Sequence, residues 1–327
     1  IGGRPCPVAR RYLIRKLLHA ASTLLFVLAF NFGLFRILPG DPIALLTRSE
    51  RLTPADIAAL RAEYGLDRPL PTQFVDYLGD VLSGELGVSL RSGAPVSTLI
   101  GERLLPTMLL VGIGALIAVA LGLLIGIKGG WTRGSRFDRG SLYGSLILYS
   151  TPEGWLGMVL LIVFAGILGW FPTGGFDSGM HTGYARVVDV ANHLFLPCAT
   201  LALGYIGEYA IIMRASLLEV ITEPYITTAR AKGVPEREVR RRHAVPNAIL
   251  PTFTLVLLSL GYVLGGAVVI ESVFSWPGLG QLTYESIRHL DYPVIQAIFL
   301  VTSASVIVLN LVADVTYGFL DPRIRHA

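Results

Sequence analysis

Six apolar stretches dominate this sequence, and they restrict it to folds that a lipid bilayer can hold. A helix that crosses a membrane needs about 20 largely apolar residues, because hydrocarbon offers no hydrogen-bond partner for free backbone groups. The composition agrees, since 53% of the residues are hydrophobic and 15% are charged, whereas soluble domains carry about a quarter charged residues. The sequence predicts an all-α integral membrane protein with six transmembrane helices over residues 17–38, 104–127, 141–170, 194–213, 249–274 and 292–319. The third stretch is long enough to be tilted or broken.

The positively charged residues indicate how these helices are oriented. Lysine and arginine are frequent before the first stretch, between the second and third, between the fourth and fifth, and after the sixth. The two short loops on the other side, 171–193 and 275–291, hold one arginine each, Arg186 and Arg288. Loops rich in lysine and arginine stay in the cytoplasm. We therefore predict that the N- and C-termini are both cytoplasmic.

The segment between the first two stretches is long enough to form a small domain. Thr53, the following proline and the nearby aspartate are typical of a helix start. A second helix is predicted over residues 72–83, and both helices are too short and too polar to cross a bilayer. We expect three parts in the chain, namely the cytoplasmic N-terminus with the first transmembrane helix (1–38), an external helical domain (39–103) and a transmembrane core (104–327).

The stretch ITTARAKGVPEREVRRRHAVPN, residues 226–247, is the most highly charged part of the chain and lies in a predicted cytoplasmic loop. Pro224 suits the first position of a short helix, Gly233 the left-handed residue after its end, and Pro235 the start of a second helix. The second helix has its acidic residues first and its arginines last, as the helix dipole favours, and Pro246 ends or kinks it. Small residues on the first helix allow close approach by another protein. A loop tethered at both ends without interleaved aromatic residues argues against nucleic acid.

This loop resembles the EAA motif of the permease subunits of binding-protein-dependent ABC importers. In that family the motif has Glu-Ala-Ala, a glycine four positions after the second alanine, and an Ile-x-Leu-Pro ending. Ala229 and Gly233 match the second alanine and the glycine, and residues 243–246 match the ending with histidine in place of isoleucine. Thr227 and Thr228 replace the glutamate and the first alanine, so the usual contacts of that glutamate are unassigned here.

These departures are similar to the dipeptide/oligopeptide-type branch, whose motif reads Tyr-x-x-Thr-Ala-Arg-Ala-Lys-Gly, as residues 225–233 do here. Further segments resemble the same branch, namely LPGDP (38–42), YGLDRPLPTQFVDYLGDVLSGELGVSL (64–90), ESVFSWPGLGQL (271–282) and DYP (291–293). They follow the family's order over nearly the whole chain. The chain therefore resembles the B-type subunit of this family, the inner-membrane component of a binding-protein-dependent transport system.

The resemblance implies a type I ABC importer permease core that moves peptides, or a related solute such as nickel, haem or glutathione, by alternating access across the cytoplasmic membrane of a prokaryote. The implied partners are membrane lipids, a second homologous permease subunit in a heterodimer, two ABC ATPase subunits that hold ATP and Mg, and an extracytoplasmic substrate-binding protein. The loop 214–248 would couple the permease to the ATPases. The residues implied in this coupling are Tyr225, Thr228, Ala229, Arg230, Ala231, Lys232, Gly233, Arg240, Arg241, Arg242, His243 and Pro246.

The chain itself carries no recognisable catalytic motif. A phosphate-binding P-loop ends in Gly-Lys-Ser/Thr, and none of Lys16, Lys128 and Lys232 follows a glycine. The zinc-protease His-Glu pair and the G-x-S-x-G elbow do not occur. Cys6 and Cys198 are the only cysteines, and their positions suggest neither a disulfide framework nor a metal site. We expect no catalytic site, metal or cofactor on this chain, with ATP hydrolysis left to partner subunits.

Four acidic residues fall in or near the apolar stretches, where charged groups are costly and often functional. Glu208 lies in the middle of the fourth stretch and is the leading candidate for the substrate path, and Glu153 follows a proline at a predicted helix break. Glu271 either lines the path or supports the gate structurally. Asp314 either lines the path or pairs with Arg323 or with a neighbouring helix.

Two other classes of protein stay open. A secondary transporter or channel could use Glu208 and Asp314 as a proton path and would need no ATPase, so co-purification with an ATPase distinguishes it from an importer subunit. A membrane enzyme would turn over without partners, and the absent motifs argue against it.

Glycine is unusually frequent in the second apolar stretch, over residues 112–130. Small residues let helices approach closely in a membrane. We predict close packing of this stretch on another helix, for which the partner permease is one candidate.

Overall fold

The computed structural model describes residues 7–37 and 67–320. Helices form almost all of the regular structure there, and the exception is one isolated bridge between Val88 and Pro95. The all-α class is confirmed for this part of the chain. The LPGDP segment and the helix predicted to begin near Thr53 lie outside the described residues.

The chain forms two compact units. The first comprises residues 1–104 and 282–327, and the second comprises residues 105–281. The first and last predicted spans therefore belong to one unit, and the four spans between them belong to the other.

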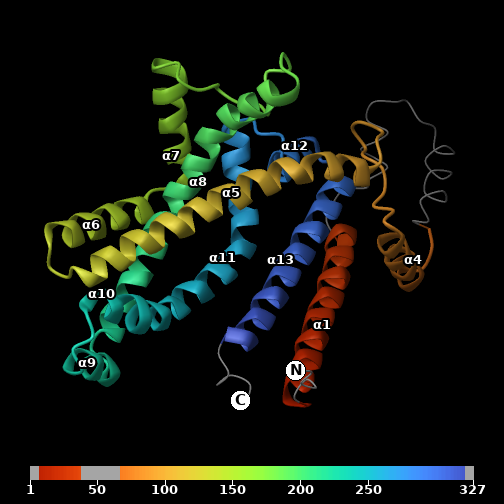
Figure 1. Ribbon diagram of the computed structural model, residues 1–327. Coiled ribbons are helices and arrows are strands. Elements are labelled where there is room, and N and C mark those ends of the chain that lie inside the picture. The colour runs from red at the N-terminus through yellow and green to blue at the C-terminus, as the bar shows by residue number, and fades with distance from the viewer. Residues whose placement is uncertain (1–6, 38–66, 321–327) are drawn as a thin grey trace. The chain divides into compact units, whose positions relative to one another are not determined.

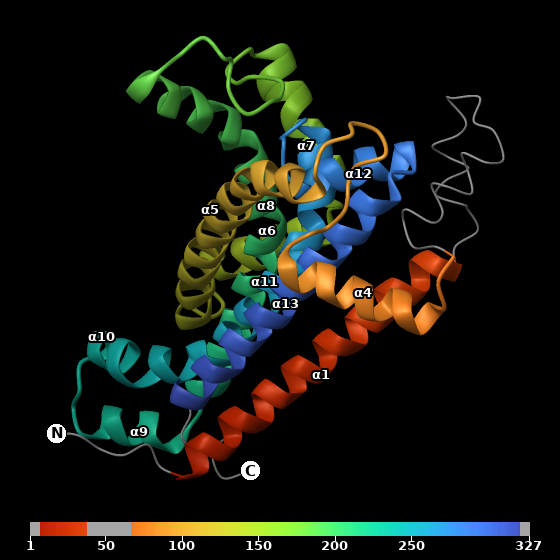
Figure 2. The ribbon, with the colours of Figure 1, turned by 90° about the vertical axis from the view of Figure 1, so that its right-hand side faces the viewer.

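In the first unit, α1 (Pro7–Ile37) and α13 (Tyr292–Leu320) lie side by side, and α4 (Leu70–Ser83) packs against α1 (Figure 1, Figure 2). Helix α4 coincides with the helix predicted over 72–83. It has a proline in its first turn and ends at Gly84, whose φ of 80° is left-handed. Both features are common signals at helix ends.

A buried asparagine connects these three helices through hydrogen bonds. Asn31 of α1 is fully buried, and its amide donates to the Tyr77 hydroxyl of α4 at 3.2 Å and to the Gln296 carbonyl of α13 at 3.1 Å. The neighbouring Phe32 packs edge-on against Phe74 of α4, with ring centroids 5.3 Å apart. Because a buried amide is costly without hydrogen-bond partners, these bonds favour one arrangement of α1, α4 and α13.

Two segments that are far apart in the sequence contact each other in the first unit. The loop 84–95 follows α4, and within it Ser89 donates its hydroxyl to the Asp291 carboxylate at 2.5 Å. The Leu90 backbone N–H donates to the other Asp291 oxygen at 3.1 Å. Asp291 is buried, and α13 begins directly after it. The GELGVSL (84–90) and DYP (291–293) segments, which carry part of the family resemblance, are therefore joined by hydrogen bonds.

The second unit contains most of the remaining helices, and α8 is at its centre, since α6, α7 and α11 all pack against it. In chain order its elements are α5 (Val96–Trp131), α6 (Arg136–Ser150), α7 (Glu153–Leu160), the π-helix η1 (Leu161–Ile167), α8 (Gly183–Val220), α9 (Pro224–Ala231), α10 (Glu236–Glu238), the π-helix η2 (Val239–Ala244) and α11 (Val245–Val273). Helix α12 (Leu279–His289) follows, and most of it belongs to the first unit.

The glycines of α5 pack against α8 of the same chain. A Cβ atom built at Gly122 would lie 2.7 Å from the Tyr209 Cβ, and one built at Gly126 would lie 2.7 Å from the Ala210 carbonyl oxygen. Gly130 continues this row one turn further along, also against α8. Only glycine allows two helix backbones to come this close. The predicted close packing is thus found inside the chain.

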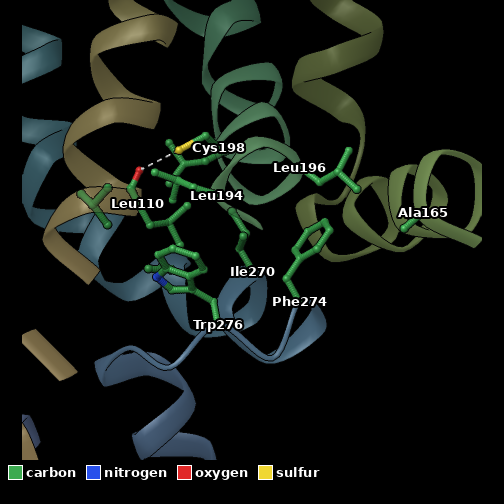
Figure 3. Packing of buried hydrophobic residues seen from close by; sticks show 11 residues of the cluster. Leu110, Ala165, Leu194, Leu196, Cys198, Ile270, Phe274 and Trp276 are labelled. Carbon is green, nitrogen blue, oxygen red and sulfur yellow. Dashed lines mark hydrogen bonds between the residues drawn. The ribbon is translucent and has the colours of Figure 1, made fainter. Parts of the chain in front are cut away.

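One apolar core of the second unit gathers around Trp276 (Figure 3). The Trp276 indole is fully buried and donates its N–H to the Pro106 carbonyl of α5 at 2.9 Å. Phe274, at the end of α11, is buried in the same cluster. The Cys198 thiol of α8 is also buried there and donates to the Leu110 carbonyl at 3.6 Å. This core joins α5, α8 and the end of α11.

Among the described residues, four helices are long and apolar enough to cross a bilayer, namely α1, α5, α8 and α13. Helix α6 taken with α7 and η1 makes a fifth candidate, which is bent by 101°. The break falls at Thr151 and Pro152, so the prediction that the third stretch is tilted or broken is confirmed as a break. Helix α11 has 29 residues and covers the fifth predicted stretch. The count of six transmembrane helices stays a prediction.

Two helical segments were not expected from hydropathy. Helix α8 extends beyond the predicted span 194–213 at both ends, and α12 lies inside the predicted loop 275–291. The extensions of α8 carry polar residues such as Arg186 and Glu219, and α12 is amphipathic. Hydropathy detects only the part of a helix that is apolar on all sides.

Candidate functional site

The most highly charged stretch of the sequence folds into a helical hairpin of α9, α10 and η2, named here the 224–244 hairpin. Pro224 is in the first turn of α9, as predicted. Gly233 has a φ of 76°, and its N–H donates to the Arg230 carbonyl at 2.9 Å. The Val234 N–H donates to the Ala229 carbonyl at 3.2 Å. This pair of bonds is the Schellman motif, which explains why a glycine stands at this position.

The second arm of the hairpin runs without a break into the next long helix. Pro235 precedes α10, which passes into η2 after one turn, and α11 begins at Val245. Pro246 lies in the first turn of α11, directly after η2 ends at Ala244, which agrees with the prediction that it ends or kinks the second helix as the next span begins. The change of register occurs before it, in the π-helical turn.

An apolar cluster lies beneath the hairpin. Its buried members are Met213 and Leu217 of α8, Ile226 and Ala229 of α9, Val239 and Ala244 of η2, and Ala248 of α11. Partly buried side chains of α5, including Trp131, pack against it. The hairpin is therefore packed as one body with the ends of three long helices. Sequence reasoning did not identify Ile226 or Val239, although Val239 is an isolated apolar residue between charged ones.

Two of the arginines that were expected to face a partner are engaged within the chain. The Arg230 Nε lies 2.8 Å from the Glu236 carboxylate across the hairpin. The Arg230 guanidinium lies 5.9 Å from the centroid of the Trp131 ring, and the Arg240 guanidinium lies 5.8 Å from the same centroid. These distances fit cation–π contacts.

The other predicted coupling residues differ in exposure. Thr228 donates its hydroxyl to the Pro224 carbonyl at 2.9 Å within its own helix, and Arg242 lies 3.8 Å from the Glu238 carboxylate. Ala229 is buried, and Arg240 and His243 are partly buried. The exposed residues are Tyr225, Thr228, Arg230, Ala231, Lys232, Gly233, Arg241, Arg242 and Pro246. The hairpin thus presents a basic surface with a row of small residues.

Glu271 is fully buried and saturated with hydrogen bonds. Its carboxylate accepts from the Thr107 hydroxyl at 2.7 Å and from the backbone N–H groups of Gly280 at 2.7 Å and Gln281 at 3.1 Å. A Cβ atom at Gly278 would collide with this carboxylate, so the PGLG sequence is required for close packing. The geometry favours the structural alternative for Glu271.

Asp314 also has a partner inside the protein. Its carboxylate lies 2.8 Å from the Lys16 ammonium of α1. This is the alternative in which Asp314 pairs with a neighbouring helix, and an ion pair between α1 and α13 accounts for both charges.

Glu153 and Glu208 lie on the same side of α8. Glu153 opens α7 at the 101° break, and its side chain packs against Gly204 of α8, where a Cβ atom would lie 3.2 Å from the Glu153 Cγ. Glu208 is one turn further along α8, so the two acidic side chains share a face. Both are partly buried. They stay candidates for the substrate path.

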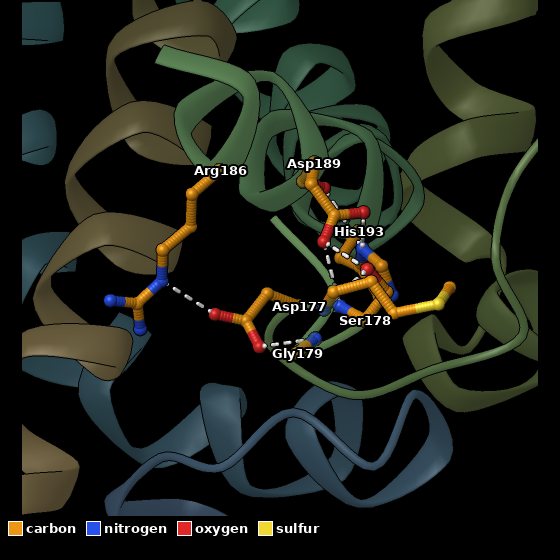
Figure 4. A network of polar contacts seen from close by, with 7 residues as sticks. Asp177, Ser178, Gly179, Arg186, Asp189 and His193 are labelled. Carbon is orange, nitrogen blue, oxygen red and sulfur yellow. Dashed lines mark hydrogen bonds and ion pairs between the residues drawn. The ribbon is translucent and has the colours of Figure 1, made fainter. Parts of the chain in front are cut away.

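A polar network that the sequence did not indicate surrounds the start of α8 (Figure 4). Asp189 accepts from both the N–H and the hydroxyl of Ser178 at 2.7 Å. The Arg186 Nε donates to Asp177 at 2.8 Å, and the His193 Nδ1 lies 2.9 Å from the Asp189 carbonyl oxygen. These bonds fix the preceding loop against the first turns of α8. In the part of the chain that the structure describes, no three acidic, histidine or cysteine side chains gather as a metal site.

The fold and the site define a multi-pass helical membrane protein with a basic helical hairpin packed on the ends of its long helices. The family model described as the binding-protein-dependent transport system inner membrane component matches residues 103–326. The model for the N-terminal region of such membrane components matches residues 9–110. The chain belongs to this family of ABC importer permeases.

Relatives align with the chain over almost their whole length. The glutathione transport system permease protein GsiC of Salmonella typhimurium (strain LT2) is 40% identical over 315 residues, which are 96% of this chain and 99% of GsiC. The oligopeptide transport system permease protein AppB of Bacillus subtilis (strain 168) is 36% identical over 316 residues, with the same two coverages. Among solved structures, the inward-facing MetNI methionine ABC transporter matches with a TM-score of 0.54 and 19% identity, covering 68% of this chain and 96% of the matched chain. That match supports the fold alone.

Proposed function

We propose that this chain is the membrane-spanning permease subunit of an ATP-driven importer for peptides or small peptide-like solutes in the cytoplasmic membrane of a prokaryote. The observation that carries the proposal is the full-length similarity to permeases named for oligopeptide and glutathione transport. Glutathione is itself a tripeptide, so both names point to one chemical class of substrate.

In this proposal six helices cross the membrane and both termini are cytoplasmic. The basic residues of the 224–244 hairpin then lie in the cytoplasm, as the charge bias of the sequence favours. The helix α4 and the rest of the 39–103 segment lie outside, where an extracytoplasmic substrate-binding protein docks.

The hairpin is the proposed contact with two ABC ATPase subunits, which hold ATP and Mg. The small residues of α9 fit into a cleft of the ATPase, and the exposed Lys232 and Arg241 fix its orientation. The hairpin side chains Ile226 and Val239 are fully buried in the apolar cluster. Closure of the ATPases therefore displaces the ends of α5, α8 and α11 together with the hairpin. A second homologous permease completes the pathway, and alternating access follows from this displacement.

Glu208 of α8 and Glu153 of α7, which packs against the same face of α8, are the proposed substrate-path residues. Glu271 and Asp314 are proposed as structural residues, because hydrogen bonds or an ion pair inside the protein account for their charges.

Reconstitution in proteoliposomes tests this function. The chain, its co-purifying permease and ATPases, and the binding protein are expected to accumulate a labelled peptide only when ATP is supplied on the hairpin side. Uptake by the chain without any ATPase, or a hairpin located outside the cell, would refute the proposal.

Gly233→Val tests the coupling role of the hairpin. A β-branched residue in the left-handed region costs about 1–2 kcal/mol, and because no atom lies within 4 Å of a Cβ at this position, the strain is entirely in the backbone. We expect ATP hydrolysis to continue while peptide uptake falls. Gly233→Asn is the control, since asparagine adopts this conformation more readily, and it should retain most uptake.

A further inference from the structure

The last residue of α5, Trp131, contacts both arms of the 224–244 hairpin. Arg230 belongs to α9 and Arg240 to η2, and their guanidinium groups lie 5.9 Å and 5.8 Å from the centroid of the same indole ring. The ring is partly buried and also packs against the apolar cluster beneath the hairpin. A single side chain thus joins one long helix to both arms.

Arg230 is held in place for this contact by a second interaction. Its Nε lies 2.8 Å from the Glu236 carboxylate, which stands at the start of the other arm. The ion pair fixes the guanidinium between the two arms while the indole contacts it. The arms are therefore linked to each other and to α5 at one point.

A similar contact on the same end of α5 serves a different neighbour. Lys128 lies one turn before Trp131, and its ammonium group is 4.2 Å from the centroid of the Phe137 ring of α6. This contact connects α5 with α6 and does not include the hairpin. It is a matched control for the Trp131 contacts, because it is also a cation–π contact of α5 but involves α6 and not the hairpin.

We propose that Trp131 is the positioning residue that transmits displacement of the hairpin to α5. The inference rests on the proposed function, in which an ATPase moves the hairpin. The indole adds a contact of α5 with both arms to the apolar packing beneath the hairpin, so its loss should loosen the attachment of the arms to α5. With the indole in place, both arms and α5 move as one body.

The test compares Trp131→Leu with Phe137→Leu in the complete transporter in proteoliposomes. Leucine keeps an apolar side chain but removes the aromatic face, and each cation–π contact changes an equilibrium by about two- to fivefold. Trp131→Leu should lower the peptide transported per ATP hydrolysed by roughly three- to tenfold, with assembly and basal ATP hydrolysis retained. Phe137→Leu should leave that ratio unchanged. Trp131→Phe should restore most of it, because phenylalanine keeps an aromatic face for the two guanidinium groups.

A second measurement needs neither ATPase nor substrate. Amide hydrogen exchange of α9 and η2 in the purified full chain should be faster in Trp131→Leu than in the wild type, and unchanged in Phe137→Leu. If Trp131→Leu does not assemble, Arg240→Gln takes its place, because it removes one cation and keeps the ring. A wild-type transport ratio and wild-type exchange in these variants would overturn the inference. Failure of the wild-type complex to move peptide would instead refute the proposed function, and the exchange result would still decide the role of Trp131.

Discussion

The 224–244 hairpin and the loop 177–182 both adjoin the long helix α8, and they are held to it by opposite means. The hairpin is packed on an apolar cluster in which Ile226 and Leu217 are fully buried. The loop 177–182 is fixed to α8 by hydrogen bonds from Ser178 to Asp189 and by an ion pair of Asp177 with Arg186, whose side chain is 58% exposed. Water is excluded from the apolar cluster under the hairpin, whereas it has access to the polar contacts of the loop.

This difference determines what each region can do. Close-packed apolar contacts are bistable and transmit a displacement as a unit. Hydrogen-bonded surface segments open locally at low cost. In the proposed function, the packing of the hairpin suits it to transmit a displacement from an ATPase to the long helices, whereas the loop 177–182 is expected to open more readily.

The largest expected effect comes from emptying the apolar cluster. Ile226→Ala leaves a cavity at a fully buried site, and such changes cost about 2–5 kcal/mol of the free energy of unfolding. We expect a lower melting temperature of the purified chain in detergent and a loss of transport per ATP hydrolysed.

The control for this prediction lies in the other region. Met180 is 80% exposed next to the polar network, so Met180→Ala removes a large apolar side chain without making a cavity. Its melting temperature should match the wild type. Equal destabilisation by the two variants would show that the regions do not differ as described.

A smaller effect is expected from the polar network. Asp189→Ala removes the acceptor of both the N–H and the hydroxyl of Ser178. We expect roughly three- to tenfold faster amide exchange around Ser178, because a typical hydrogen bond contributes modestly once water competes for it. The hairpin amides should exchange at wild-type rates. Ser178→Ala keeps the backbone bond, so a larger effect of this variant than of Asp189→Ala would contradict the assignment.

Much of the hairpin could be predicted from the sequence because local rules determine it. Proline in a first turn and glycine at a left-handed helix end act through backbone geometry alone, so Pro224 and Gly233 are placed correctly. The break of the third apolar stretch likewise follows from its proline. The family segments also appear in the sequence in order.

The contacts of charged side chains could not be predicted in this way. Arg230 and Arg240 were expected to face outward, but their partner Trp131 is about 100 residues earlier in the chain, and only the packing of α5 on α8 brings it near. The polar network was also not predicted. Hydropathy assigns 177–193 to a loop, although α8 already begins at Gly183. The pairings of Glu271 and Asp314 likewise depend on tertiary contacts.

The smallest effect is expected from the ion pair that links the two arms of the hairpin. Arg230 and Glu236 have side chains that are 39% and 59% exposed, and pairs of this kind contribute about 0–1 kcal/mol. Glu236→Gln should therefore change the melting temperature little, and the small change should disappear at high salt, because screening weakens exposed pairs. Thermal unfolding of the wild type and the variant at low and high ionic strength measures this. A large loss of stability in Glu236→Gln at low ionic strength would mean that the charged surface, and not the apolar cluster beneath it, holds the hairpin together.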